Sequence, residues 1–304
     1  MSFLKNIFSV RKIDNHIMCL LFGVQIKFKY KTEYKCPVVK DYGLTTQKRD
    51  TKIIASLTSF PGRIDSVYKT VSTLLTQSLK PDEVILWLAE EQFPDKKLPE
   101  NLTSLEKFGL SIRWCEDIRS YKKLIPALRE YPNDIIITFD DDIYYAEDTI
   151  ETLYASYLKH PSDIHSHRCG LVKVKDDMIH DIPMRKLYFA EFNQASYFIR
   201  QIGYGGVLYP PRALHPDVFD RKKYTELVPT HDDIWFWVMA VLNYTKIRSV
   251  KGYEESVNYV EDTQKLGLCK INKTTSFGGS VDDAIDKLSQ LYPRFINILE
   301  ENDE

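Results

Sequence analysis

The chain has 304 residues, of which 43% are hydrophobic and 28% are charged. This composition is ordinary for a globular enzyme, and it excludes disordered, collagen-like and multi-span membrane proteins. The length allows one large domain or two small ones, and we expect one. Its 5 cysteines are widely spaced and form no CxxC pair. They predict neither a disulfide framework nor a zinc site, so we expect a reducing, cytoplasmic location.

The charge is spread unevenly along the chain. Residues 1–50 hold ten Lys and Arg against four Asp and Glu, a balance of +6, while the formal net charge of the whole chain is -2. A basic arm favours an anionic partner, and the cytoplasmic face of the inner membrane is the first candidate. A solvated arm explains the charge equally well, and we expect no nucleic-acid partner. Within the arm, the apolar runs on both sides of Gly23 predict a short hairpin over Ile17 to Ile26.

From Lys52 onward, apolar and periodic runs alternate along the chain. In chain order they predict strands at 53–57, 84–88, 111–114, 135–139 and 163–167, separated by helices at 64–75, 102–108, 124–129 and 147–158. The run Ile135 to Phe139 consists only of β-branched and aromatic residues, as a central strand buried on both faces requires. Such alternation predicts an α/β fold with a mostly parallel central sheet and helices on both faces, in which ligands bind at the carboxyl ends of the strands.

The pattern changes after Arg168. Residues 171–200 give no clear pattern, and Gly203, Gly205 and Gly206 then precede a strand at 207–209. Glycines at this place predict a sharp bend or a backbone that passes close to a ligand. A helix at 234–242, a strand at 247–250 and a helix at 282–291 follow.

Three carboxylates, Asp140, Asp141 and Asp142, leave the predicted central strand together. Their mutual repulsion is unfavourable unless a cation or water screens it. Oxygen ligands suit Mg²⁺ or Mn²⁺, and Mg²⁺ is usually held by one or two carboxylates together with substrate phosphates. The motif therefore predicts a metal site for a phosphorylated substrate, although helix capping or solvent exposure is an alternative.

A second acidic pair, Asp232 and Asp233, opens the predicted helix at 234–242. Asp is common at helix starts, but the preceding glycines favour a second wall of a cleft, where a carboxylate takes a proton from an acceptor hydroxyl. Lys122, Lys123 and Arg63 lie in loops at the expected ligand-binding edge, where a cation stabilises a departing diphosphate.

Six segments, in order, resemble the GT-A-fold glycosyltransferases related to family 2, which assemble bacterial surface polysaccharide, lipooligosaccharide or capsule. They are SLTSFPGR, PDEVILWLAEEQFP, SYKKLIPAL, TFDDDIYY, GGVLYPP and THDDIWF, and they run from about Lys52 to Val250. The resemblance implies a Rossmann-like single domain and a metal-dependent hexosyl transfer from a nucleotide-sugar, a UDP-sugar first of all, to a glycan or glycolipid acceptor. A looser likeness to exostosin-like transferases leaves open whether the sugar's configuration is inverted or retained, and we favour inversion.

The resemblance also implies roles for single residues. Asp142 and Asp140 correspond to the metal ligands, and Asp233 or Asp232 to the catalytic base. The residues it implies for donor binding are Thr58, Ser59, Arg63, Tyr121, Lys122, Lys123, Asp140 and Asp141. The residues it implies for acceptor binding are Gly205, Gly206 and Trp235. The chain is thus divided into a basic arm with a hairpin (1–50), a catalytic domain (51–250, with a nucleotide-sugar half at 51–168 and an acceptor half at 169–250) and a C-terminal tail with a helix (251–304).

Two other functions fit parts of the pattern. A phosphatase of the haloacid dehalogenase type also carries paired aspartates after an apolar strand, but Tyr144 stands where its motif has Thr or Val. An inactive carbohydrate-binding scaffold protein is the third hypothesis, which the intact acids at both sites disfavour.

Overall fold

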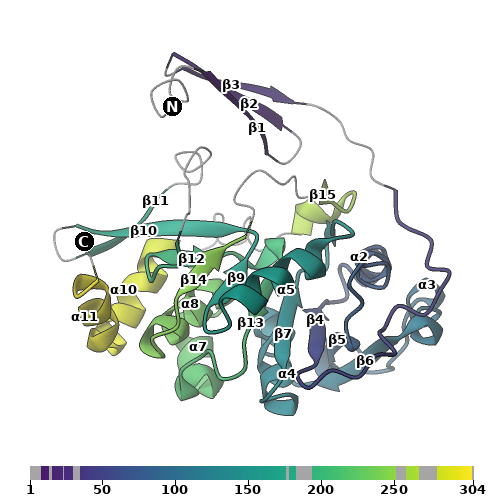
Figure 1. Cartoon of the computed structure of the whole chain (residues 1–304). Helices are drawn as coiled ribbons and strands as arrows, with labels where there is room; N and C mark the ends of the chain where they lie inside the picture. The colour runs from purple at the N-terminus through teal and green to yellow at the C-terminus, as the bar shows by residue number, and fades with distance from the viewer. Residues whose placement is uncertain are drawn as a thin grey trace.

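The computed structural model describes residues 8–13, 16–22, 24–29, 35–175, 178–182, 194–250, 258–266 and 279–302. It is a mixed α/β domain around a seven-stranded sheet with the order β14-β9-β13-β7-β4-β5-β6. The strands of this sheet are β4 (Ile53–Thr58), β5 (Glu83–Ala89), β6 (Leu110–Cys115), β7 (Ile135–Phe139), β9 (Ile164–Ser166), β13 (Val207–Tyr209) and β14 (Ile247–Ser249). The predicted Rossmann-like α/β class is confirmed, and Figure 1 shows the arrangement.

Strand direction follows the prediction with one exception. Neighbours pair in parallel from β7 through β4 and β5 to β6, and again between β14 and β9. β13 runs antiparallel to both β7 and β9. The sheet is therefore mostly parallel, with β7 at its centre as the apolar run at 135–139 predicted.

Helices cover both faces of the sheet because alternate strand residues enter two separate cores. Ile54, Ile85 and Ile136 point into one core and their neighbours Ile53, Val84 and Ile135 into the other. The second core is covered by α2 (Val67–Leu74), α3 (Glu100–Thr103) and α5 (Thr149–Lys159). The first is covered by α4 (Ile125–Glu130), α7 (Arg221–Leu227), α8 (Asp232–Leu242), α10 (Val281–Leu291) and α11 (Pro293–Glu300).

Helices α7 and α11 were not predicted from the sequence, whereas the helix expected at 282–291 is α10. Both C-terminal helices contribute to the core, since Phe295 of α11 meets the ring of Trp237 in α8 edge-on at 5.0 Å. The division of the chain into an arm, a catalytic domain and a tail stays a prediction.

A small antiparallel sheet with the order β11-β10-β12 lies where residues 171–200 showed no clear sequence pattern. Its strands are β10 (Cys169–Lys175), β11 (Met178–Ile182) and β12 (Ile199–Gln201). A two-stranded sheet joins β8 (Ile143–Tyr144) to β15 (Asn258–Tyr259). The remaining short segments are 3-10 helices at η1 (Glu90–Gln92), η2 (Glu106–Phe108), η3 (Arg119–Lys123), η4 (Gly203–Gly205), η5 (Pro216–Phe219) and η7 (Thr263–Leu266).

The N-terminal strands form a sheet of their own, with the order β1-β2-β3. They are β1 (Phe8–Ile13), β2 (His16–Leu21) and β3 (Val24–Lys29), and β2 pairs with β3 as the hairpin prediction requires. Figure 1 shows them apart from the central sheet, and residues 35–52 connect the two. Arg49 fastens the end of this connection by an ion pair of 2.6 Å with Asp82. No helix among the described ranges is long and apolar enough to cross a membrane.

Candidate active site

Strand register brings four separate loops to one edge of the sheet. β4 and β7 are parallel, with Leu57 opposite Phe139, so the loop that begins at Ser59 lies beside the turn Asp140 to Asp142. β13 is antiparallel, with Val207 opposite Thr138, so η4, which comes just before β13, lies at the same edge. The 3-10 helix η3 follows β6 and reaches this edge as well. These loops carry most of the side chains predicted to be functional.

The first group of side chains at this edge is the arginine cluster, formed by Ser59, Arg63, Asp141, Asp142 and Gln264. Arg63 forms ion pairs through Nη1 with Oδ1 of Asp141 at 2.6 Å and through Nη2 with Oδ2 of Asp142 at 2.9 Å. The hydroxyl of Ser59 donates to Oδ2 of Asp141 at 2.5 Å. Nε2 of Gln264 donates to Oδ2 of Asp142 at 2.7 Å. One guanidinium therefore holds two of the three consecutive carboxylates.

The three charged side chains of the arginine cluster are almost buried. The side chains of Arg63, Asp141 and Asp142 are 11%, 7% and 6% exposed. Burial raises the pKa of Asp142 to about 7, although the charge of Arg63 opposes this shift. Burial also raises the pKa of Asp141, against the same opposing charge and the hydrogen bond from Ser59. Desolvation of the carboxylates thus outweighs their pairing with the single cation.

A segment from the C-terminal part of the chain, residues 258–266, covers this cluster, and we call it the strap. The Val260 amide donates to the backbone oxygen of Asp142 at 2.8 Å. Nη2 of Arg63 donates to the backbone oxygen of Thr263 at 3.4 Å. Glu261 forms an ion pair with Lys69 of α2 at 3.0 Å. The strap is thus bound to both loops of the arginine cluster.

The second group is the lysine cluster, formed by Ser120, Lys123, Asp140, Asp232 and Asp233. Nζ of Lys123 lies 2.9 Å from Oδ1 of Asp140, 3.0 Å from Oδ2 of Asp232 and 3.9 Å from Oδ1 of Asp233. The hydroxyl of Ser120 donates to Oδ1 of Asp232 at 2.8 Å. A single ammonium group thus joins the acid that follows β7 to the acidic pair that begins α8.

Gly203 leaves room for this arrangement. Its amide donates to Oδ2 of Asp233 at 3.0 Å. A Cβ atom at this position would lie 2.5 Å from Nζ of Lys123 and 2.9 Å from Oδ1 of Asp233, closer than real Cβ atoms approach. The glycine run does mark a close approach, and the group approached is the lysine cluster.

The lysine cluster keeps two carboxylates partly open, since the side chains of Asp140 and Asp233 are 31% and 28% exposed. Burial raises the pKa of Asp233 to about 6; Lys123 opposes the shift, and Asp232 and Asp140 add to it. Lys123 itself has a pKa held well above its usual value by its three carboxylate partners, against the effect of its own burial. A partly exposed carboxylate with a pKa near 6 is suited to accept a proton at neutral pH.

Two residues predicted to bind ligands belong to the core instead. Tyr121, predicted to bind the donor, is fully buried; its hydroxyl donates to the backbone oxygen of Val228 at 2.5 Å, and its ring stacks on Tyr224. Trp235, predicted to bind the acceptor, is also fully buried, and its indole donates to the backbone oxygen of Val218 at 3.3 Å. Both rings pack in the apolar core of the domain, so their predicted contacts with donor and acceptor find no support in this geometry.

The other predicted residues have partners within the protein. Lys122 forms an ion pair with Asp117 at 2.6 Å and so points away from both clusters. The hydroxyl of Thr58 donates to the backbone oxygen of Trp87 at 2.8 Å. A Cβ on Gly205 would lie 2.5 Å from the side chain of Arg168, and Gly206, with φ of 88°, faces Phe139. These two glycines serve a tight bend, and neither lies against the acidic groups.

Four residues of the site were not predicted from the sequence. Ser120 and Gln264 complete the two clusters. The hydroxyl of Tyr145 accepts the Asp140 amide at 2.9 Å and fixes the acidic turn. Gly203 was noticed only as part of a glycine run. The glycine run shortly before the strand at 207–209 was the available clue, whereas Ser120, Tyr145 and Gln264 carry none.

The metal expected from the sequence is only partly matched by the residues present. Within the described part of the chain, no three His, Cys, Asp or Glu side chains are grouped to hold a metal ion. The crowding of Asp140, Asp141 and Asp142 is relieved by Arg63 and Lys123, so crowding alone does not require a metal. Oδ2 of Asp140 and Oδ1 of Asp142 have no ion pair or hydrogen bond from the described residues, which fits a metal held by two carboxylates with substrate phosphates and water completing the shell.

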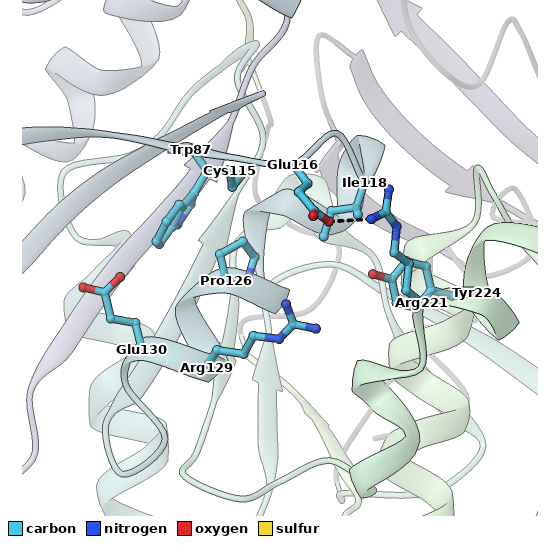
Figure 2. A pocket seen from close by; sticks show the side chains of 9 residues that line it. All are labelled: Trp87, Cys115, Glu116, Ile118, Pro126, Arg129, Glu130, Arg221 and Tyr224. Carbon is cyan, nitrogen blue, oxygen red and sulfur yellow. Dashed lines mark hydrogen bonds and ion pairs between the residues drawn. The ribbon is translucent and has the colours of Figure 1, made fainter. Parts of the chain in front are cut away.

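A hollow of about 440 Å³ is lined by Trp87 of β5, by Cys115 at the end of β6 and by residues of α4 and α7, and none of the acids of the two clusters lines it. Figure 2 shows its lining residues, with the ion pair between Glu116 and Arg221 across one side. Two arginines and two glutamates line it together, so it offers no clear preference for the charge of a ligand. We place the candidate site at the two clusters because they gather interacting ionisable groups with shifted pKa values.

Comparison with protein-family models found no match, and comparison with curated proteins found none either. Among the solved structures that match is a cytidylyltransferase from Leptospira borgpetersenii serovar Hardjo-bovis (strain JB197), with 14% sequence identity and a TM-score of 0.41. The match covers 82% of this chain and 97% of that chain. At this identity and TM-score the likeness carries no argument about function, and the fold class rests on the strand order described above.

Proposed function

We propose that the protein is a glycosyltransferase that moves a sugar from a nucleotide-sugar, a UDP-sugar first of all, to a hydroxyl of a bacterial surface glycan or glycolipid. The observation that carries the proposal is the lysine cluster, in which Lys123 joins Asp140 to Asp232 and Asp233. It brings a predicted donor-binding acid and a predicted catalytic pair into one place, although they are far apart in the sequence.

On the donor side, Asp140 and Asp142 would hold Mn²⁺ or Mg²⁺. When bound, the metal would supply positive charge against the diphosphate of the donor. Arg63 and Lys123 hold the two flanking loops in place through their carboxylate partners. Arg63 also brings a cation to the edge where negative charge develops on the leaving group.

On the acceptor side, Asp233 is the proposed base. Its carboxylate is fixed through Oδ2 by the Gly203 amide, and it is the more exposed member of the acidic pair, at 28% against 7% for Asp232. Asp232 is held by Ser120 and Lys123, so it positions Lys123 and leaves proton transfer to Asp233. Attack by a hydroxyl activated in this way inverts the configuration of the sugar.

The test is incubation of the protein with a panel of sugar nucleotides, with Mn²⁺ and with chelator, while nucleoside diphosphate release is measured. We expect release from at least one donor that depends on metal and is lost in Asp233→Asn. An Asp95→Asn variant is the matched control, since Asp95 is exposed and lies outside both clusters. Absent or metal-independent release across the panel contradicts the proposal, and phosphate release from p-nitrophenyl phosphate instead supports the phosphatase hypothesis.

A further inference from the structure

The hydroxyl of Tyr145 stands between two loops that carry or hold acids of the lysine cluster. Tyr145 is 8% exposed, and its hydroxyl accepts a hydrogen bond from the Asp140 amide at 2.9 Å. The same hydroxyl donates to the backbone oxygen of Tyr204 at 3.3 Å. Asp140 follows β7, and Tyr204 belongs to η4. One hydroxyl group therefore joins the backbones of the acidic turn and of η4.

The position of Tyr145 is set by the central sheet and by α2. Its ring meets the fully buried ring of Phe139, the last residue of β7, edge-on at 4.7 Å. The Tyr145 amide donates to the hydroxyl of Thr73 in α2 at 3.4 Å. Burial raises the pKa of Tyr145 well above its usual value, and the charge of Asp140 adds to the rise, so the hydroxyl keeps the proton that it donates. The core thus fixes a point to which both loops are attached.

Each of the two loops controls one of the partly exposed carboxylates of the lysine cluster. The acidic turn carries Asp140 itself, whose Oδ1 lies 2.9 Å from Nζ of Lys123. Gly203, the first residue of η4, holds Oδ2 of Asp233 through its amide at 3.0 Å. Lys123 joins the carboxylate groups of these two acids, whereas Tyr145 joins the backbones of the loops that carry or hold them. The separation of the two carboxylates therefore depends on Tyr145 as well as on Lys123.

We propose that Tyr145 is a positioning residue that sets the distance between Asp140 on the donor side and the base Asp233 on the acceptor side. This inference rests on the proposed function, which assigns the two acids to those sides. A displacement of about 1 Å can lower the rate of an enzyme by roughly 100-fold, even when the reacting groups are intact. Tyr145→Phe keeps the ring and removes both hydrogen bonds at once, so it loosens the two loops without emptying the core.

The first test compares Tyr145→Phe with Tyr197→Phe in the full-length chain. Tyr197 is a matched control, since it is also 8% exposed and its hydroxyl donates to the backbone oxygen of Tyr244 at 3.3 Å, outside both clusters. Nucleoside diphosphate release is measured with Mn²⁺ and with the sugar nucleotide of the panel that gives the fastest release. We expect kcat to fall roughly 10-fold in Tyr145→Phe and to change by less than about twofold in Tyr197→Phe.

The same change in a variant without the base separates positioning from a general loss of structure. In the Asp233→Asn background, Tyr145→Phe should lower kcat by less than about twofold, because the group that it positions is absent. A merely structural role would lower kcat by the same factor in both backgrounds. Equal factors in the two backgrounds, or equal losses in the two tyrosine variants, overturn the proposal.

Hydrogen exchange of the protein alone supplies a readout that needs no substrate. In Tyr145→Phe we expect faster exchange both at the Asp140 amide and in η4, while Tyr197→Phe keeps the native rate at both places. Faster exchange in only one of the two loops, or in neither, overturns the proposal. Absent release by the native protein contradicts the proposed function itself, and the exchange rates then still decide whether Tyr145 joins the two loops. Release by the native protein with equal losses in the two tyrosine variants contradicts only the role of Tyr145.

Discussion

The arginine and lysine clusters contain the same kinds of side chain but differ in how far their aspartates are exposed to solvent. Each places one cation among aspartates at the same edge of the sheet, yet Asp141 and Asp142 are 7% and 6% exposed, while Asp140 and Asp233 are 31% and 28% exposed. The strap also covers the arginine cluster. The lysine cluster is instead approached by Gly203, which has no side chain to cover it. The comparison teaches that adjacent acids of one motif have different surroundings: Asp141 is buried against Ser59 and Arg63, and Asp140 stays partly exposed to solvent.

The largest expected effect separates the roles of the two clusters. Asp233→Asn should lower the transfer rate by about 10²–10⁴-fold, because it removes the proton acceptor, and it should leave donor binding intact. Under the proposed function, Asp142→Ala should abolish donor binding, because Asp142 is one of the two carboxylates proposed to hold the metal. Donor binding is measured by calorimetry and transfer by nucleoside diphosphate release. An equal loss of donor binding in both variants would refute this division of roles.

The second prediction concerns the stability that the two cations provide. Lys123→Met should lower the free energy of unfolding by about 3–5 kcal/mol, because it leaves buried carboxylates without their counter-charge. Lys122→Met is the matched control: its partner Asp117 is 30% exposed, so water compensates for part of the lost pair and the expected loss is smaller. Urea unfolding followed by circular dichroism measures both. Similar losses of unfolding free energy in the two variants would contradict the claim that Lys123 is the main counter-charge of its cluster.

The smallest expected effect is on the pH dependence of stability. The pKa of Asp233 is raised from 3.8 to about 6 in the folded protein, so the folded state holds this proton more tightly than the unfolded state. The resulting stability is present below pH 4 and is lost as the pH rises through 6. The Asp233→Asn variant carries no titrating group here and does not lose this stability. At pH 7 its free energy of unfolding should therefore exceed that of the native protein by about 2–3 kcal/mol. Urea unfolding of both proteins at pH 4 and pH 7 checks this. A difference in unfolding free energy between variant and native protein that is the same at both pH values contradicts it.

The centre of the sheet was predictable because β4, β5 and β7 are largely apolar, almost fully buried runs. Ile135 to Phe139 has no polar residue that would place one face in solvent, except Thr138, which is itself buried. The small sheet of β10, β11 and β12 was not predicted. Its strands mix charged and apolar residues, so no clear periodicity marks them. In addition, β10 pairs with β12, which lies far along the sequence.

The candidate site was predictable in its acids and not in its aromatic residues. Tyr121, Lys122 and Lys123 are consecutive in η3, yet they point into the core, toward Asp117 and into the lysine cluster respectively. Sequence spacing in a short 3-10 helix does not decide among three directions, because they depend on what packs against the helix. Ser120 and Gln264 were missed for a related reason, since their partners are 112 and 122 positions away.

The strap has a consequence for how the protein is made. A ribosome releases the chain from its N-terminus, so the turn that holds Asp142 emerges long before Gln264, which lies 122 positions later and caps its carboxylate. A nascent chain that stops before residue 258 already contains Arg63, Lys123 and all the acids of both clusters, but it lacks the cover of the first. The arginine cluster is therefore completed only after residue 264 has been made, and shorter chains carry Asp142 without the cover of the strap.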